Sequence, residues 1–323
     1  MTKQMAANIL FMGTPDFAVP CLEALLHEGY SIKAVVTQPD RPKGRKKVLT
    51  PPPVKEVALK HGLPVLQPEK VKHALDEIAA LEPDLIVTAA YGQILPKALL
   101  DLPRLGAINV HASLLPKYRG AAPIQYAIMN GDSVTGVTIM YMEEGLDTGD
   151  MISKVEIPIG REDDAGTMFD VLSHAGAKLL MDTLPGLLSG SLQAEPQNDE
   201  EATYAKTIKR EDERIDWTRT SNEIYNHVRA LSPWPGAFTT WNGEVFKIWS
   251  ADDPEKTTAA GDDTKSAPGT VLQAAEGILT VRTGDGALRL KEIQPAGKKR
   301  MNVESFLTGK GIQTGTLLGG HEL

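Results

Sequence analysis

Three polar residues of this chain, Asn109, His111 and Asp147, have types and spacing that suit acyl-transfer chemistry. Asn109 and His111 stand two apart in the apolar run 107–111 (AINVH), so in a β-strand both side chains leave the same face. Asp147 follows in the acidic stretch 143–150 (EEGLDTGD). An amide and an imidazole can donate hydrogen bonds to an oxyanion, and a carboxylate can orient the imidazole or relay a proton. The trio therefore indicates transfer of an acyl group to an amine.

The trio has no evident nucleophile of its own. Ser113 lies two residues beyond His111, but no G-x-S-x-G surrounds it, which makes a serine nucleophile the weaker interpretation. The seven histidines have no paired metal-ligand spacing, so we expect no metal. A bland alternative is that Asn109 caps a turn and His111 is an ordinary buried histidine. The acidic stretch downstream favours the chemical interpretation: direct transfer between two bound substrates.

Composition limits the class of protein. The chain has 323 residues, enough for two domains, and 41% hydrophobic and 24% charged residues are typical of a globular protein. A net charge of -8 argues against a general nucleic-acid coating protein, so RNA contact would need a local basic patch. The single cysteine excludes an internal disulfide framework. With no run of 18 apolar residues and no signal-peptide pattern, we expect a cytoplasmic protein with no membrane partner.

Strand and helix patterns alternate through the first 190 residues. Apolar runs predict strands at 8–12, 31–37, 63–66, 84–90, 107–111, 135–142 and 151–159, and helical spacing predicts helices at 17–27, 54–61, 71–82, 123–129 and 164–188. This order predicts an α/β fold with a Rossmann-like, mostly parallel sheet. The turn at Gly13 lacks the glycines of a dinucleotide fingerprint. Since ligands bind at the carboxyl ends of such strands, residues 90–95 and 111–116 are expected to border one pocket.

A basic stretch interrupts this pattern at 38–53 (QPDRPKGRKKVLTPPP). Its five prolines argue against a helix or a central strand, and we expect an exposed, irregular loop. Charge runs are usually solvated surface. The alternative is an arm that contacts RNA phosphates, and the pattern alone does not decide between the two.

The last third of the chain has a different pattern of predicted secondary structure, with mostly short strands. A polar segment, 190–207, separates a catalytic domain at 1–189 from a second domain at 208–323. The second domain begins with a helix at 221–230, for which Ser221 is the expected N-cap. Short strands at 238–241, 244–249, 270–273, 278–283 and 287–293, with a hairpin turn at Asn242-Gly243, predict an OB-like β-barrel.

With these residues in place, the chain resembles the folate-dependent formyltransferases. The resemblance rests on 109–111 (NVH), 113–116 (SLLP), 118–120 (YRG) and the later Asp147. It implies the formyltransferase fold, 10-formyltetrahydrofolate as the formyl donor and no metal. It also implies that Asn109, His111 and Asp147 are the catalytic residues. The folate contacts that it implies are Ser113, Leu114, Leu115, Pro116, Ala89, Tyr91, Gly92, Gln93, Ile94 and Leu95. The pterin pocket that it implies combines the segment 89–95 with the loop 143–147.

The shared core does not fix the acceptor. Further stretches at 11–17 (FMGTPDF), 37–42 (TQPDRP), 120–125 (GAAPIQ) and 294–299 (QPAGKK) resemble the branch of the family that formylates the α-amine of methionine on initiator Met-tRNA, for translation initiation. In that branch the basic loop enters the acceptor stem, and Arg45 matches its key arginine. The implied tRNA contacts are Arg41, Lys43, Arg45, Lys46, Lys47, Lys298, Lys299 and Arg300. We expect a monomer. A sugar-nucleotide acceptor, and a non-catalytic folate- or RNA-binding protein, remain alternatives.

Overall fold

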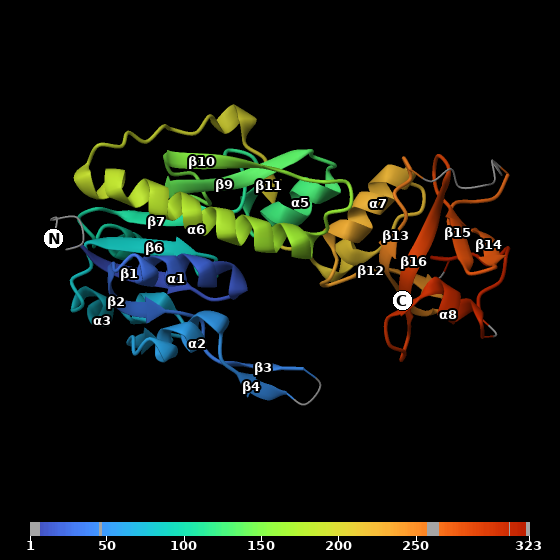
Figure 1. The fold of residues 1–323 in the computed structure, drawn as a ribbon, viewed down its shortest axis with the longest axis horizontal. Coiled ribbons are helices and arrows are strands. Elements are labelled where there is room, and N and C mark those ends of the chain that lie inside the picture. Colours follow the sequence, from blue (N-terminus) through green and yellow to red (C-terminus); the bar gives the residue numbers. More distant parts are fainter. Residues whose placement is uncertain (1–6, 45–46, 257–264, 310, 321–323) are drawn as a thin grey trace. The chain divides into compact units, whose positions relative to one another are not determined.

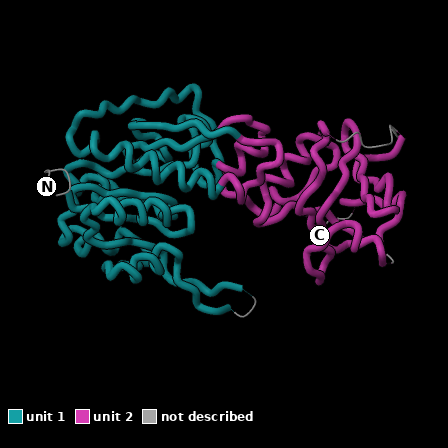
Figure 2. Tube along the Cα trace, viewed as in Figure 1, with its two compact units in different colours: residues 1–123, 135–158, 169–205 teal, residues 124–134, 159–168, 206–323 magenta. Residues whose placement is uncertain are grey.

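The computed structural model describes residues 7–44, 47–256, 265–309 and 311–320, and the chain divides into two compact units. Unit 1 comprises residues 1–123, 135–158 and 169–205, and unit 2 comprises residues 124–134, 159–168 and 206–323 (Figure 2). The chain thus passes between the units more than once. Domain boundaries at 1–189, 190–207 and 208–323 stay a prediction.

Unit 1 is built on one sheet of seven strands (Figure 1). Its strands lie in the order β10 (Met151–Pro158), β9 (Val134–Tyr141), β7 (Ala107–His111), β6 (Leu85–Ala89), β1 (Asn8–Gly13), β2 (Ser31–Val36) and β5 (Val65–Leu66). The pairs from β5 through β7 are parallel, whereas β9 runs antiparallel to β7. The Rossmann-like, mostly parallel sheet is therefore confirmed.

Helices cover this sheet. They are α1 (Val19–His27), α2 (Pro53–Lys60), α3 (Leu75–Ala79) and the long α6 (Ala165–Ser189), which Figure 1 labels, together with the short α4 (Lys97–Leu100). Helix α6 approaches β7 closely, because a Cβ placed on Gly176 would lie 2.8 Å from Cγ1 of Val110. The helix predicted at 71–82 is shorter than expected: a 3₁₀ turn (Val71–His73) precedes α3. No helix among the described residues is long and apolar enough to cross a membrane.

The prediction that the basic stretch 38–53 is an irregular loop is wrong, because part of it forms two strands. Strands β3 (Arg41–Lys43) and β4 (Val48–Thr50) form an antiparallel hairpin, with Pro42 opposite Leu49. A two-stranded ribbon consists of edge strands only, and proline is tolerated at an edge. Exposure was predicted correctly, since the described residues from Arg41 to Leu49 are exposed. Arg45 and Lys46 lie outside the described residues.

Unit 2 contains a six-stranded antiparallel sheet. Its order is β12 (Ala237–Trp241), β13 (Glu244–Ala251), β16 (Ala287–Pro295), β15 (Ile278–Arg282) and β14 (Val271–Ala275), with β17 (Met301–Asn302) on β16. Its helices are α5 (Pro123–Met129), α7 (Ser221–Ala230) and α8 (Val303–Leu307). The turn between β12 and β13 places Asn242 and Gly243 at φ 53° and 78°, as a two-residue hairpin requires. This arrangement is consistent with the predicted OB-like barrel.

Candidate active site

His111 and Asp147 meet at the end of β7. Nδ1 of His111 lies 3.7 Å from Oδ2 of Asp147, and the two side chains are only 6% and 17% exposed. On the other side of the ring, Nε2 lies 3.0 Å from the carbonyl oxygen of Tyr118. A carbonyl can only accept, which assigns a proton to Nε2. Nδ1 is then the nitrogen that faces Asp147 and the space beside it.

Asn109 comes from the middle of the same strand. Being two residues before His111, it leaves β7 on the same face. Its Oδ1 lies 2.8 Å from the hydroxyl of Thr88 on the neighbouring strand β6. If this hydroxyl donates, the amide NH₂ of Asn109 is turned away from Thr88 and is free to donate to a ligand. Sequence reasoning missed Thr88, because it lies inside an apolar strand and carries no motif.

The loop that begins at Ser113 is rigid. The Ser113 hydroxyl is buried and donates to the carbonyl of Lys117 at 2.6 Å. Thr138 ties the loop to β9: its hydroxyl donates to the carbonyl of Ser113 at 2.7 Å and accepts from the backbone N–H of Leu115 at 3.1 Å. Since the Ser113 hydroxyl is committed to its own loop, the loop suits a wall rather than a nucleophile. Leu114, Leu115 and Pro116 belong to this wall, and Leu115 is buried.

The second predicted folate segment follows β6. Ala89, Tyr91 and Leu95 are buried, whereas Gly92 and above all Ile94, which is 86% exposed, reach solvent. Burial raises the pKa of Tyr91 to about 12, and its hydroxyl has no hydrogen-bond partner among the described residues. The Gln93 side chain is held by the backbone N–H of Val71 at 2.8 Å. Tyr91 and Leu95 thus support the segment from inside, and Ile94 is its exposed apolar side chain.

A cavity of about 400 Å³ lies beside the acidic loop of unit 1. Its lining includes Leu100, Ala107 and Met142 together with Glu143 and Glu144. Ala107 begins β7, so the cavity lies toward the opposite end of that strand from His111. None of the residues from Ala89 to Leu95 lines it. The cavity therefore borders the loop 143–147, one of the two segments that the resemblance implies for the pterin, and not the segment 89–95.

The basic residues fall into two groups that the structure describes separately. In unit 1, Arg41, Lys43 and Lys47 are exposed on the β3–β4 hairpin, where Arg41 pairs with Glu69 at 2.7 Å. In unit 2, Lys298, Lys299 and Arg300 are exposed in the turn before β17. Arg300 forms an ion pair with Glu292 and lies 5.3 Å from the ring centroid of Trp249.

Metal ligands do not gather in the described part of the chain: no group of three histidine, cysteine or carboxylate side chains is placed to hold an ion. The polar groups at the site are those of Asn109, His111 and Asp147, and they can hydrogen-bond and move protons. This chemistry needs two bound substrates, one with an acyl carbon and one with a nucleophile.

Family models match most of the chain. A model of the formyl transferase family matches residues 7–184, and a model of the formyl transferase C-terminal domain matches residues 207–311. Among curated proteins, the chain is 58% identical to a methionyl-tRNA formyltransferase of Bacillus subtilis (strain 168) over 315 residues, which cover 97% of this chain and 98% of that protein. It is 57% identical to a methionyl-tRNA formyltransferase of Geobacillus sp. (strain WCH70), over 94% of this chain and 95% of that one.

Solved structures of lower identity have a similar fold. HypX from Aquifex aeolicus, in complex with tetrahydrofolic acid, matches with a TM-score of 0.63 at 16% identity, over 95% of this chain and 48% of HypX. An N-formyltransferase from Helicobacter canadensis, in complex with folinic acid and dTDP-3-aminofucose, matches with a TM-score of 0.65 at 18% identity, over 91% of this chain and 99% of that one. At these identities the likeness concerns the fold alone. The family models and the near full-length relatives show that the chain belongs to the formyl transferase family and, within it, to the methionyl-tRNA formyltransferases.

Proposed function

We propose that this chain transfers the formyl group of 10-formyltetrahydrofolate to the α-amine of methionine on initiator Met-tRNA. The observation that carries the proposal is the identity of 58% to a methionyl-tRNA formyltransferase over 97% of the chain. The His111–Asp147 pair, at 3.7 Å, supplies the proton-handling groups that amine acylation needs. Aminoacylated tRNA is made and used in the cytoplasm, and we place the reaction there.

The reaction forms one bond to the formyl carbon and breaks another. The unprotonated amine of methionine attacks the formyl carbon, a C–N bond forms, and the carbonyl oxygen gains negative charge. Asn109 donates its amide N–H to this oxygen. Nδ1 of His111, which carries no proton when Nε2 donates to Tyr118, takes up the proton of the attacking amine and then becomes a second donor. The bond from the formyl carbon to the folate nitrogen then breaks, while a proton passes from the attacking amine to the leaving nitrogen. Asp147 beside Nδ1 orients His111 and assists this transfer.

Folate binding is assigned to the two loops that flank these groups. The family uses a folate, and the rigid 113–116 loop and the segment 89–95 both follow strands that end at the same edge of the sheet. Ser113 supports its loop from inside, and Ile94 offers an exposed apolar surface. A flat, partly apolar ring system suits such walls. Formyl transfer requires no metal in this scheme.

Recognition of the tRNA is assigned to the two basic groups. Lysine and arginine side chains contact phosphates without reading sequence, so they position the acceptor end. In an acidic chain these exposed cations are local attractive sites for RNA. Arg45 belongs to this proposal through its place in the sequence, although it lies outside the described residues.

The direct test mixes the purified chain with 10-formyltetrahydrofolate and charged initiator Met-tRNA and follows formylmethionyl-tRNA. We expect product with the native chain and none with His111→Ala, whose folding is checked by circular dichroism. A sugar nucleotide with a free amine is the competing acceptor. Product from the sugar and none from Met-tRNA would refute the proposal. Arg45→Ala should weaken use of tRNA and leave folate binding intact.

A further inference from the structure

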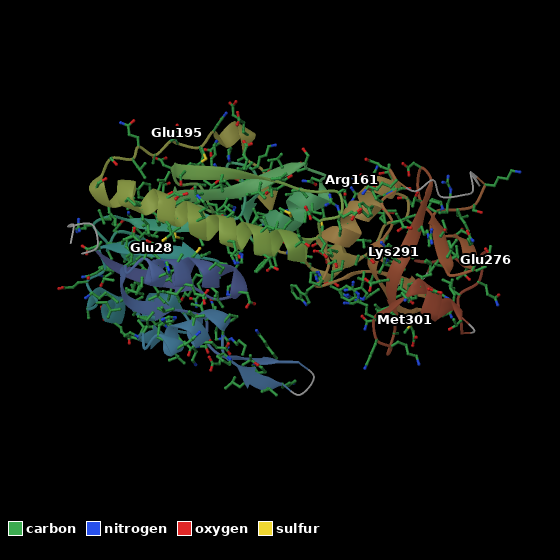
Figure 3. The ribbon with its side chains drawn as sticks, viewed as in Figure 1. Glu28, Arg161, Glu195, Glu276, Lys291 and Met301 are labelled. Atoms are coloured by element: carbon green, nitrogen blue, oxygen red, sulfur yellow. The ribbon has the colours of Figure 1, made fainter. Side chains whose placement is uncertain are left out.

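One segment outside the site contacts both halves of it. Residues 195–205, named the strap from here on, run back along unit 1 before the chain enters unit 2, and Glu195 marks the beginning of the strap above β10 (Figure 3). Glu195 and Met151 exchange two backbone hydrogen bonds of 2.8 Å. At the other end, β11 (Tyr204–Ala205) pairs in parallel with β8 (Arg119–Gly120). The strap is therefore fixed at both ends by its backbone.

Between these ends, a single amide holds the loop of Asp147. Nε2 of Gln197 donates to the carbonyl oxygens of Asp147 and Gly149, each at 2.8 Å. Its Oε1 accepts from Nε of Arg119 at 2.9 Å. Both polar atoms of this side chain thus form hydrogen bonds, and both donated bonds go to backbone carbonyls on either side of the proposed catalytic carboxylate.

Arg119 is the anchor of Gln197. Its side chain is only 2% exposed, and its guanidinium also pairs with Asp199 at 2.8 Å. A buried arginine held by a carboxylate and an amide has one geometry available. The position of Gln197 is consequently tied to the buried guanidinium of Arg119, which the strap holds a second time through Asp199, an exposed residue.

The loop of Asp147 needs such a support. Residues 143–146 are exposed, and Asp147 itself has φ 52°, a left-handed conformation that is uncommon for non-glycine residues, although aspartate tolerates it better than most. The carboxylate is fixed by the backbone N–H of Gly120, which donates to Oδ2 at 2.8 Å. Gly120 lies in β8, so the strand that pairs with the strap also carries the donor to Asp147.

The strap reaches the His111 side as well. The hydroxyl of Thr203 accepts from the backbone N–H of Tyr118 at 2.9 Å, and the carbonyl of Tyr118 is the partner of His111 Nε2. One segment therefore fixes the carbonyl that orients the imidazole and, through Gln197, the backbone that orients the carboxylate.

We propose that Gln197, held by Arg119, is a positioning residue for formyl transfer, which keeps Asp147 in its left-handed conformation and at its distance from His111. This inference rests on the proposed function, because it assigns the purpose of that geometry. Gln197 touches neither the reacting atoms nor the side chains of Asp147 and His111, and it acts through the loop backbone alone.

The test replaces Gln197 by residues of similar size. Gln197→Glu keeps the volume and the acceptor for Arg119 but loses the two donated bonds, and it turns a carboxylate toward two carbonyls. Gln197→Leu loses every hydrogen bond. The matched control is Glu200→Gln, a change in the same strap at an exposed side chain that makes no hydrogen bond or ion pair among the described residues. Misplacement of a catalytic group by about 1 Å costs about 100-fold, so we expect kcat to fall about 10- to 100-fold in both Gln197 variants, with KM for Met-tRNA little changed. Gln197→Leu also leaves Nε of the buried Arg119 without its acceptor, so its melting temperature should fall, whereas that of Gln197→Glu should change less. Glu200→Gln should match the native chain.

A second measurement does not depend on the substrate. Hydrogen–deuterium exchange of residues 143–150 should become faster in both Gln197 variants, while exchange at β8 and β11 stays slow. If Gln197→Glu keeps native exchange in this loop and native kcat, the inference is wrong and Gln197 only fills space. If the native chain itself fails to formylate Met-tRNA, faster exchange of the loop in the Gln197 variants would still support the positioning of Asp147, and only the proposed acceptor would be refuted.

Discussion

The hydroxyl of Thr88 offers a graded test of the oxyanion donor. Thr88 is 2% exposed, and its Oγ1 lies 2.8 Å from Oδ1 of Asn109 and 3.0 Å from the carbonyl of Ile108. A threonine has one proton to donate. When it goes to Asn109, the amide N–H groups point toward the substrate. When it goes to Ile108, the opposite amide orientation is favoured and the donor is lost.

Thr88→Val removes the hydroxyl with almost no change in volume. A net hydrogen bond of this kind is worth about 1 kcal/mol, so the ratio of productive to flipped Asn109 should fall about fivefold, and kcat should fall by at most that factor. Asn109→Ala removes the donor itself, and the expected loss is about 100- to 1000-fold in kcat. Comparing the loss of kcat in the two variants thus separates the effect of turning the donor away from the effect of removing it.

The assay is single-turnover formylation at saturating folate, with circular dichroism to check folding. Thr88→Ser is the control: it keeps the hydroxyl and loses a methyl group, so stability should fall by about 1 kcal/mol while the rate stays near that of the native chain. A Thr88→Val loss as large as that of Asn109→Ala, or an Asn109→Ala rate within threefold of native, would contradict the reasoning.

Three further outcomes are expected. Lys43→Ala should weaken tRNA binding and lower the slope of log affinity against log salt by about 1, in filter binding at several salt concentrations, since one phosphate contact is lost; an unchanged slope would exclude the hairpin lysine from the contact. Gly149→Ala should impair folding or activity, because its Cβ would lie 2.0 Å from the carbonyl oxygen of Tyr141; normal melting and turnover would show that the loop can shift. The pKa of Glu223 is lowered to about 2, first by the backbone N–H of Thr220, so this carboxylate stabilises the fold above pH 4.5 and loses that effect as the pH falls toward 2. Because the side chain is 43% exposed, the contribution is about 1 kcal/mol. Urea titrations should show Glu223→Gln to be less stable than the native chain at pH 6 and equally stable at low pH.

Local patterns predicted the elements that position the site. The strand 107–111 was identified because a short apolar run between turn signals fits a buried strand, and its period of two placed Asn109 and His111 on one face. The Asn242-Gly243 hairpin was predicted for a similar reason, since few other residue pairs adopt the backbone that the turn requires. In each case the residues that decide the local structure are close neighbours along the chain.

Interactions over long sequence separations could not be read in this way. Thr88 supports Asn109 from another strand, and Gln197 holds the backbone of Asp147 fifty residues away. Neither carries a motif, because a hydroxyl or an amide in an ordinary segment becomes a support only when the fold brings its partner close. A smaller error of the same kind concerns α7, whose N-cap is Thr220 rather than Ser221. The Thr220 hydroxyl accepts from the N–H of Glu223, and the Glu223 carboxylate accepts from Thr220, a reciprocal pair that decides the first residue of the helix.

The rigid site and the basic hairpin differ in how each is stabilised. His111 and Asp147 are held by the parallel sheet, by the strap and by buried hydrogen bonds, so their geometry exists before substrate binds. The β3–β4 hairpin has two three-residue strands, and Val48 and Leu49 are 59% and 64% exposed. A ribbon of this size is marginal without a partner. Contacts with RNA would therefore stabilise the hairpin and leave the reacting groups unmoved, so that substitutions there should change affinity for the acceptor, whereas substitutions around Asp147 should change the rate of the chemical step.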